Sequence, residues 1–173
     1  MSSAVQYTMQ QAQLTVGPQV VETGNGPSGD DLCQFVICRI GQEEFAVDVL
    51  SVQEINRLVE VTRVPKTPRF VEGVINLRGR IIPVLDLRRR FGLTASTHTL
   101  QSRIVVVSVQ AKLVGFIVDS VVEVLRVPKS AIEPPPNVGS SAGAEFTQGV
   151  GRIDDRLLIV LDLNRLLMKH EAS

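Results

Sequence analysis

The sequence has no tryptophan and only one tyrosine, and its charges cancel, with 18 Lys and Arg against 18 Asp and Glu. A nucleic-acid-binding protein normally presents a basic surface with aromatic side chains that stack on bases. A balanced chain that is 4% aromatic offers neither feature. The composition therefore argues against nucleic acid and against an acidic membrane surface as the partner, and it favours recognition by shape.

Catalytic and metal-binding groups are also sparse. The two histidines are His98, in a Thr/Ser-rich segment, and His170, near the terminus, and we expect neither to lie near a plausible partner. No phosphate-binding loop, dinucleotide fingerprint or metal-ligand spacing occurs. Cys33 and Cys38 lie five residues apart in one strand-like run, on opposite faces and too far apart for a disulfide. We therefore predict a non-enzymatic protein without a cofactor or a metal.

Long hydrophobic runs are absent as well. No apolar stretch reaches the roughly 20 residues that a membrane-spanning helix needs. The first residues, MSSAVQYTMQ, have neither the basic leader nor the apolar segment of a signal peptide. We expect a cytoplasmic protein without direct membrane insertion.

The residues that are present favour β structure. Val, Ile and Leu dominate the apolar set, and β-branched side chains suit strands. Residues 1–31 are rich in polar residues and Gly, which predicts a flexible tail. Over residues 32–168, short apolar runs alternate with Gly, Pro and charged turn residues, as in small β-barrels. Asp86 and Asp162 each follow an apolar run as helix caps, and the second cap predicts a C-terminal helix before a tail at 169–173.

Several short motifs occur twice in the same order, which indicates an internal duplication. The pairs are RVPK at 63–66 and 126–129, GV at 73–74 and 149–150, and VLDL at 84–87 and 160–163. We predict two related lobes, with Val64-Pro65 and Val127-Pro128 at equivalent positions. A single lobe of this size has a marginal core, so the two lobes are expected to pack together. The run Arg88-Arg89-Arg90 is predicted to be a solvated helix face.

Residues 46–92 contain the most specific motifs, namely VQEI at 52–55, GVINLRG at 73–79 and IIPVLDLR at 81–88. Together with VGFIVDSVVEVL, IEPPP and RLLIVLDLNRLL further on, they resemble the CheW-like domain family of bacterial chemotaxis over roughly residues 32–168. The resemblance implies two five-stranded barrels of the SH3 kind with short helices, no enzymatic activity and an adaptor role. It implies as partners the cytoplasmic tips of chemoreceptors, the regulatory domain of the histidine kinase CheA, and further CheW-like copies in array rings. An adaptor of a pilus or surface-sensing array is the alternative within the family.

The same resemblance implies a partner-binding site in the first lobe. Its VQEI and NLRG motifs supply the candidates Val52, Glu54, Ile55, Asn76, Arg78 and Gly79.

Two of these roles have alternatives. In an extended strand Val52 would share a face with Glu54 and contact a partner, or it would instead fill the edge of the lobe. Arg78 would hold a partner through its planar guanidinium, or it would only brace Glu54. Gly79 is predicted to supply a turn with positive φ.

Overall fold

The computed structural model describes residues 31–136 and 143–171, with side chains described as far as residue 167. The tail predicted for residues 1–31 therefore lies outside the described residues, apart from Asp31. In chain order the elements are β1 (Leu32–Ile40), β2 (Glu43–Asp48), η3 (Val49–Ser51), β3 (Val52–Arg57), β4 (Val71–Leu77), β5 (Arg80–Asp86), α2 (Leu87–Arg90), β6 (Arg103–Val109), β7 (Lys112–Val118), β8 (Ser120–Pro128), η4 (Lys129–Ala131), β9 (Ile132–Glu133), η5 (Ala144–Phe146), β10 (Thr147–Ile153), β11 (Arg156–Leu161) and α3 (Leu163–Glu171).

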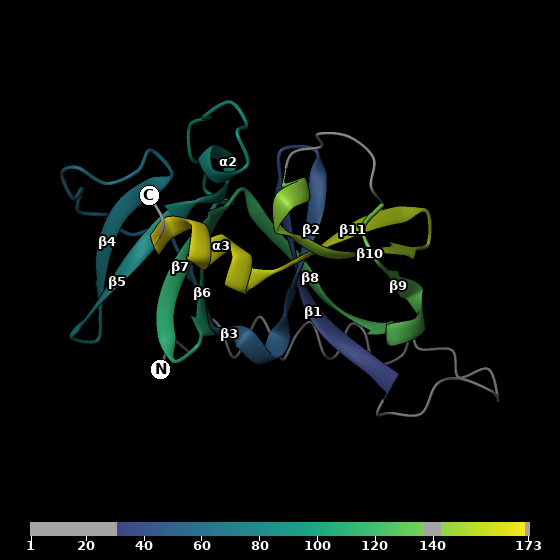
Figure 1. Cartoon of the computed structure of the whole chain (residues 1–173). Helices are drawn as coiled ribbons and strands as arrows, with labels where there is room; N and C mark the ends of the chain where they lie inside the picture. The colour runs from purple at the N-terminus through teal and green to yellow at the C-terminus, as the bar shows by residue number, and fades with distance from the viewer. Residues whose placement is uncertain (1–30, 137–142, 172–173) are drawn as a thin grey trace.

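The strands form two sheets that lie side by side (Figure 1). Lobe one is the sheet β3-β6-β7-β5-β4, and lobe two is the sheet β8-β1-β2-β11-β10-β9. Neighbouring strands are antiparallel except for the parallel pairs β5–β7 and β2–β11. This arrangement confirms the predicted mainly β fold of two related lobes with SH3-like architecture, to which lobe two adds the short strand β9.

The two lobes have exchanged their hairpins. Hairpin β1–β2 precedes β3 in the chain, yet it pairs with β8 and β11 in lobe two. Hairpin β6–β7 follows β5 and pairs with β3 and β5 in lobe one. Each sheet therefore contains strands from both halves of the sequence, and neither half can complete its lobe alone.

The internal repeat is confirmed in the last part of each lobe. Gly73 in β4 and Gly149 in β10 each follow a register shift against the next strand. The short helix α2 follows β5, as α3 follows β11. The side chains of Asp86 and Asp162 accept hydrogen bonds from N–H groups in the first turn of these helices, at 2.9 and 3.1 Å, so both predicted caps are confirmed.

The proposed equivalence of the two RVPK segments is wrong. Val127-Pro128 ends strand β8, whereas Val64-Pro65 lies in the loop between β3 and β4. In lobe one the residue that bridges to β4 is Thr62, which precedes Pro65. In lobe two the residue that bridges to β10 is Glu133, which follows Pro128. The lobes thus use different lengths of chain before the bridge, and similar tetrapeptides occupy different places.

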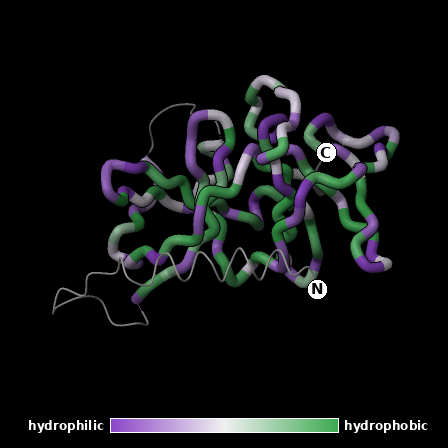
Figure 2. Tube along the Cα trace, turned by 180° about the vertical axis from the view of Figure 1, so that it is seen from behind, coloured by the Kyte–Doolittle hydropathy of each residue, from purple (hydrophilic) through white to green (hydrophobic). Residues whose placement is uncertain are grey.

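A shared hydrophobic core joins the lobes. Phe45 of β2 stacks on Phe91, which follows α2, with ring centroids 5.0 Å apart, and Phe91 lies 5.9 Å from Phe146 of η5. The same cluster takes in residues of β1, β3, β6, β7 and α3, and each lobe has a smaller cluster of its own. The hydrophobic segments follow the strands, while the outer turns are mostly hydrophilic (Figure 2). The expectation that the lobes pack against each other is confirmed.

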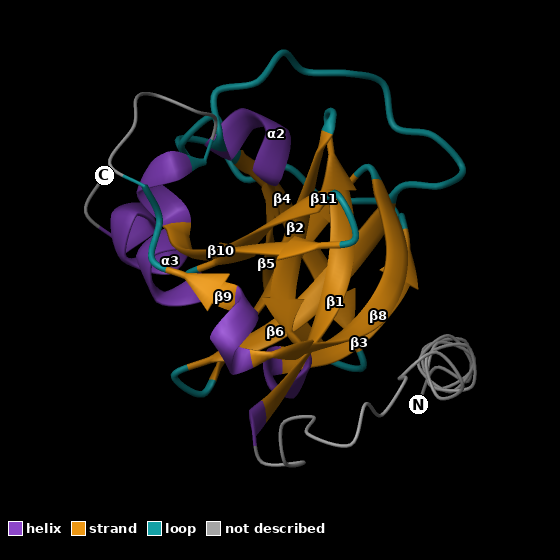
Figure 3. Ribbon diagram, turned by 90° about the vertical axis from the view of Figure 1, so that its right-hand side faces the viewer, coloured by secondary structure: helices purple, strands orange, loops and turns teal. Residues whose placement is uncertain are grey.

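The C-terminal helix is longer than the sequence predicted. Helix α3 continues to Glu171, into the segment that was expected to be a tail. It lies close to α2 beside the strands (Figure 3), and the guanidinium of Arg90 donates a hydrogen bond to the carbonyl of Leu166 at 3.1 Å. Within the described ranges, no helix has the length and apolar character that spanning a membrane requires.

The two cysteines are both unpaired, as predicted. Cys38 lies in the shared core, and burial raises the pKa of its thiol to about 12. Such a thiol stays protonated at neutral pH and acts as a small apolar side chain.

Candidate partner-binding site

A tight turn at the tip of the β4–β5 hairpin carries the NLRG motif. Arg78 and Gly79 occupy its two central positions with φ of 53° and 82°, and positive φ at both positions is what a type I′ hairpin turn requires. The side chain of Asn76 accepts a hydrogen bond from the N–H of Gly79 at 2.9 Å. The predicted positive φ of Gly79 is confirmed, and the hydrogen bond holds the turn in one conformation.

Arg78 reaches from this turn to Glu54 on strand β3. Its guanidinium nitrogen lies 3.0 Å from Oε2 of Glu54, and the side-chain amide of Asn56 donates to Oε1 at 2.6 Å. The Glu54 side chain is 9% exposed, while that of Arg78 is 51% exposed. Arg78 does brace Glu54, and half of its side chain still faces solvent, where a partner could contact it.

A β-bulge changes the faces of β3. Val52 pairs with Val107 and Glu54 with Val106, so two steps along β3 match one step along β6. Val52 and Ile55 are therefore both buried in the shared core, at 8% and 7% exposed. The expectation that Val52 shares a polar face with Glu54 is wrong, and Val52 fills the core instead.

An exposed isoleucine beside the turn was missed in the sequence. Ile81 is 65% exposed and pairs across the hairpin with Asn76, while the next residue, Ile82, is buried. Adjacent residues of a strand point to opposite faces, so only one side chain of the Ile81-Ile82 pair can enter the core. That alternation was the available signal. Together with Arg78, Ile81 gives the hairpin tip an apolar and a cationic group.

The arginine run of α2 is not a solvated face. Arg88 holds Asp119 through two nitrogens at 2.8 and 2.9 Å, and Arg89 lies 3.1 Å from the carboxylate of Glu72. The guanidinium of Arg90 lies between two aromatic rings of the lobe interface, 4.0 and 4.6 Å from their centroids. All three arginines therefore make specific contacts, and the prediction of a solvated face is wrong.

Asp119 links the lobes through its carboxylate. Besides Arg88 it accepts a hydrogen bond from the N–H of Gly41, in the β1–β2 turn, at 2.8 Å. Burial acts to raise the pKa of Asp119, but the hydrogen bonds from Arg88 and Gly41 outweigh it and hold the pKa below its usual value. The ionised carboxylate thereby fastens α2 of lobe one to a hairpin of lobe two.

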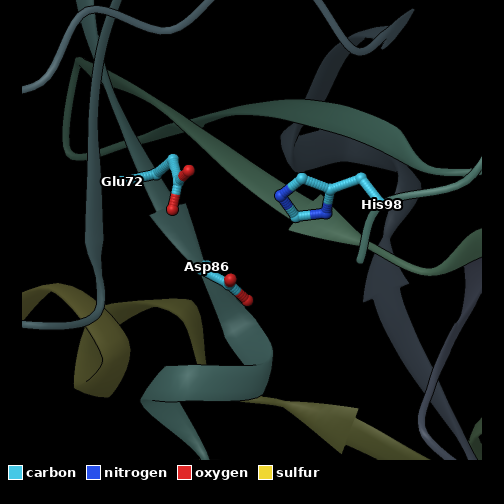
Figure 4. A group of neighbouring side chains, drawn as sticks. All are labelled: Glu72, Asp86 and His98. Atoms are coloured by element: carbon cyan, nitrogen blue, oxygen red, sulfur yellow. The ribbon is translucent and has the colours of Figure 1, made fainter. Parts of the chain in front are cut away.

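His98 has acidic neighbours that the sequence did not reveal. The loop after α2 brings its imidazole to Glu72 of β4 and Asp86 of β5, with ligand atoms of all three residues within 4.8 Å of one another (Figure 4). The expectation that His98 lies near no plausible partner is therefore wrong. The side chain of His170 lies outside the described residues.

Comparisons with known proteins agree with the fold. The family model described as the CheW-like domain matches residues 34–171. "Chemotaxis protein CheW" of Klebsiella aerogenes is 36% identical over 140 residues, which are 81% of this chain and 84% of that protein. The protein of the same name from Thermotoga maritima is 37% identical over 140 residues, covering 80% and 91% of the two chains.

A solved structure is similar in three dimensions. The crystal structure of the scaffolding protein TtCheW from Thermoanaerobacter tengcongensis superposes with a TM-score of 0.71 at 38% identity, covering 75% of this chain and 88% of that one. The two lobes share one core, and lobe one carries an NLRG hairpin tip held by a hydrogen bond to Asn76. The family model matches nearly all of the described residues. The chain belongs to the CheW-like domain family.

Proposed function

We propose that this protein couples chemoreceptors to the histidine kinase CheA. At the coarser level it is a non-catalytic chemotaxis adaptor, and the observation that carries this is the match of residues 34–171 to the CheW-like domain. The finer proposal names the receptor tips and the kinase regulatory domain as its partners. Further CheW-like copies in the array rings are a third partner.

The β4–β5 hairpin tip supports contact with a partner protein. Interface centres favour Arg and large apolar side chains on rigid, well-packed elements. Arg78 and Ile81 are such side chains, and the type I′ turn with its Asn76 hydrogen bond already holds the tip in place. Little conformational entropy is then lost when a partner docks.

Val52 and Ile55 support the site indirectly. Because both side chains lie in the shared core, they position β3 and hence Glu54, which in turn holds Arg78. We therefore propose Arg78, with Asn76 and Gly79 shaping its turn, as the contacting part of the site. Glu54 positions Arg78, and Val52 and Ile55 hold the strand.

The two lobes also differ in charge, which suits an adaptor that must hold unlike partners. On lobe one, a hollow of about 630 Å³ is lined by Arg63, Lys66 and Arg69. On lobe two, the charged residues that line a hollow of about 940 Å³ are of both signs, namely Glu43, Glu44, Glu133, Arg152 and Arg156. Complementary charge steers association and rejects wrong partners. The balanced total charge therefore includes a mainly basic hollow on lobe one and a hollow of mixed charge on lobe two.

The proposed location is the cytoplasm, with recruitment to membrane-associated receptor arrays through the receptor tips. Neither nucleic acid nor direct insertion into a membrane has a part in this function.

Co-sedimentation tests the proposal. Purified protein is spun with receptor cytoplasmic fragments, with CheA, and with both, and each component alone is the control. We expect the kinase to enter the receptor pellet only when this protein is present, and receptor control of kinase activity to follow. A kinase that pellets equally well without the protein would contradict the coupling role.

A further inference from the structure

We infer that Glu72, Asp86 and His98 form a binding site for a divalent transition metal ion such as Zn²⁺ on lobe one. The three residues come from separate segments, namely β4, the end of β5, and the loop between α2 and β6. Their side chains nevertheless converge, with ligand atoms within 4.8 Å of one another (Figure 4). The site is independent of the proposed receptor and kinase coupling.

The two carboxylates are well placed to act as ligands. Asp86 is buried, and the N–H of Arg88 holds its Oδ1 at 2.9 Å, so its orientation is set before any ion arrives. Oε2 of Glu72 is shielded from solvent and accepts no well-aligned hydrogen bond from the described residues, although Nη1 of Arg89 lies 3.1 Å from it. A carboxylate oxygen whose neighbouring cation is poorly aligned for a hydrogen bond keeps the capacity for a further ligand, such as a water or an ion.

The charges of the side chains around the site do not balance. Arg89 lies 3.1 Å from Glu72 and 3.5 Å from Asp86, so a single positive charge serves two carboxylates. The neighbouring Arg88 is engaged by Asp119. With His98 neutral, the group formed by Glu72, Asp86 and Arg89 carries a net negative charge. A metal ion at the three side chains would offset it.

The donor set selects among metals. One imidazole nitrogen and two carboxylates suit Zn²⁺ and related first-row ions, which accept mixed nitrogen and oxygen ligands. Ca²⁺ and Mg²⁺ prefer oxygen ligands throughout, so they should compete poorly for a site that contains His98. Three protein ligands also leave a coordination position open to water.

Metal binding would fasten the loop that carries His98 onto the β4–β5 hairpin. An ion that binds the folded chain and not the unfolded one raises the unfolding temperature as its concentration increases. The loop between α2 and β6 would gain order at the same time. The expected consequence is thus a zinc-dependent stabilisation of lobe one.

The test uses the full chain, expressed without a histidine tag and dialysed against a chelator. Zinc chloride is titrated at pH 7.5 by isothermal calorimetry into the wild type, His98→Ala and Glu72→Gln. His170→Ala is the matched control, because it removes the only other histidine. We expect one zinc ion per chain in the wild type and in His170→Ala, and an affinity lower by about tenfold or more in the other two variants. Co²⁺ should give visible absorption bands that His98→Ala abolishes.

Three results would overturn the site. The first is no zinc uptake by the wild type, and the second is equal uptake by His98→Ala. The third is a nuclear magnetic resonance titration in which zinc leaves the signals of the His98 imidazole unchanged. Thermal melts of each variant without metal show whether a lost signal comes from unfolding.

Discussion

The guanidinium of Arg78 lies 3.0 Å from the carboxylate of Glu54. Arg78 lies at the tip of the β4–β5 hairpin and Glu54 lies in β3, which is not a neighbour of β4 or β5 in the strand order of lobe one. Glu54 is nearly buried while Arg78 is half exposed, so the pair connects the interior of the lobe to its surface. The same arginine can thus position its own strand and contact a partner.

Arg78→Ala should weaken receptor-coupled kinase activation and cost moderate stability. Among the described residues, Glu54 then keeps the hydrogen bond from Asn56, and a buried carboxylate that loses a partner costs about 1 to 3 kcal/mol. Loss of an interface arginine should lower partner affinity by roughly thirty-fold, or about 2 kcal/mol. Binding assays and urea unfolding measure the two effects separately.

A double-mutant cycle with Glu54→Ala separates the two roles of Arg78. If Arg78 acts only through Glu54, both single variants and the double variant will show the same binding defect. If each residue touches a partner, the defects will add. Arg80→Ala, an exposed arginine across the turn, is the control. Normal coupling by Arg78→Ala would remove this hairpin tip from the proposed interface.

Ile55→Ala and Ile81→Ala should have opposite consequences. Ile55 is 7% exposed in the shared core, and its truncation should cost about 2 to 4 kcal/mol by leaving a cavity. Ile81 is 65% exposed, so its truncation should change stability by less than about 0.5 kcal/mol yet weaken partner binding. Calorimetric melts and co-sedimentation of both variants provide the comparison. A stable Ile55→Ala protein that fails to bind would instead assign Ile55 to the interface.

Two glycines of the β4–β5 hairpin should respond very differently to alanine. A Cβ on Gly73 would clash with the carbonyl oxygen of Thr62, and its φ of 153° is unfavourable as well. A Cβ on Gly79 would meet no atom within 4 Å, and only its φ of 82° would be strained. Gly73→Ala should cost about 3 kcal/mol or more, and Gly79→Ala about 1 kcal/mol. Equal costs in urea unfolding would show that backbone conformation alone governs both positions.

Asp119→Asn should destabilise the protein in a pH-dependent way. The folded state holds the pKa of Asp119 below its usual value, so the ionised carboxylate stabilises the fold at pH values above about 3.9, the ordinary value for Asp. This contribution is lost as the pH falls through the lowered pKa. The difference in Tm between wild type and Asp119→Asn should therefore be largest near neutral pH and shrink below about pH 4.

Arg88→Met supplies the control for that experiment. It removes the side chain that donates three hydrogen bonds to Asp119, two of them from Nε. In this background Asp119→Asn should change Tm little at any pH. A full pH-dependent difference without Arg88 would mean that the Gly41 N–H alone sustains the shift.

Features encoded by neighbouring residues could be predicted from the sequence. Asp86 and Asp162 cap their helices because a carboxylate binds N–H groups two or three residues further on. Gly79 sits at positive φ because a two-residue hairpin turn demands it. The hairpin β1–β2 and the family motifs were visible for the same reason, since each lies within a short stretch of chain. The internal repeat was visible because its short motifs recur in the same order.

The tertiary structure alone decided which hairpin completes which lobe. Both hairpins have similar apolar patterns, so the exchange depends on packing between segments far apart in the chain, which no local pattern records. The bulge in β3 places the Val52 side chain in the core, and it arises from the pairing of β3 with β6. A shift of one residue in strand register moves a side chain to the other face of the sheet. His98 meets Glu72 and Asp86 only because a loop folds back over a hairpin. The sequence by itself thus determined the turns, the caps and the family, whereas long-range contacts determined which side chains face solvent, core or one another.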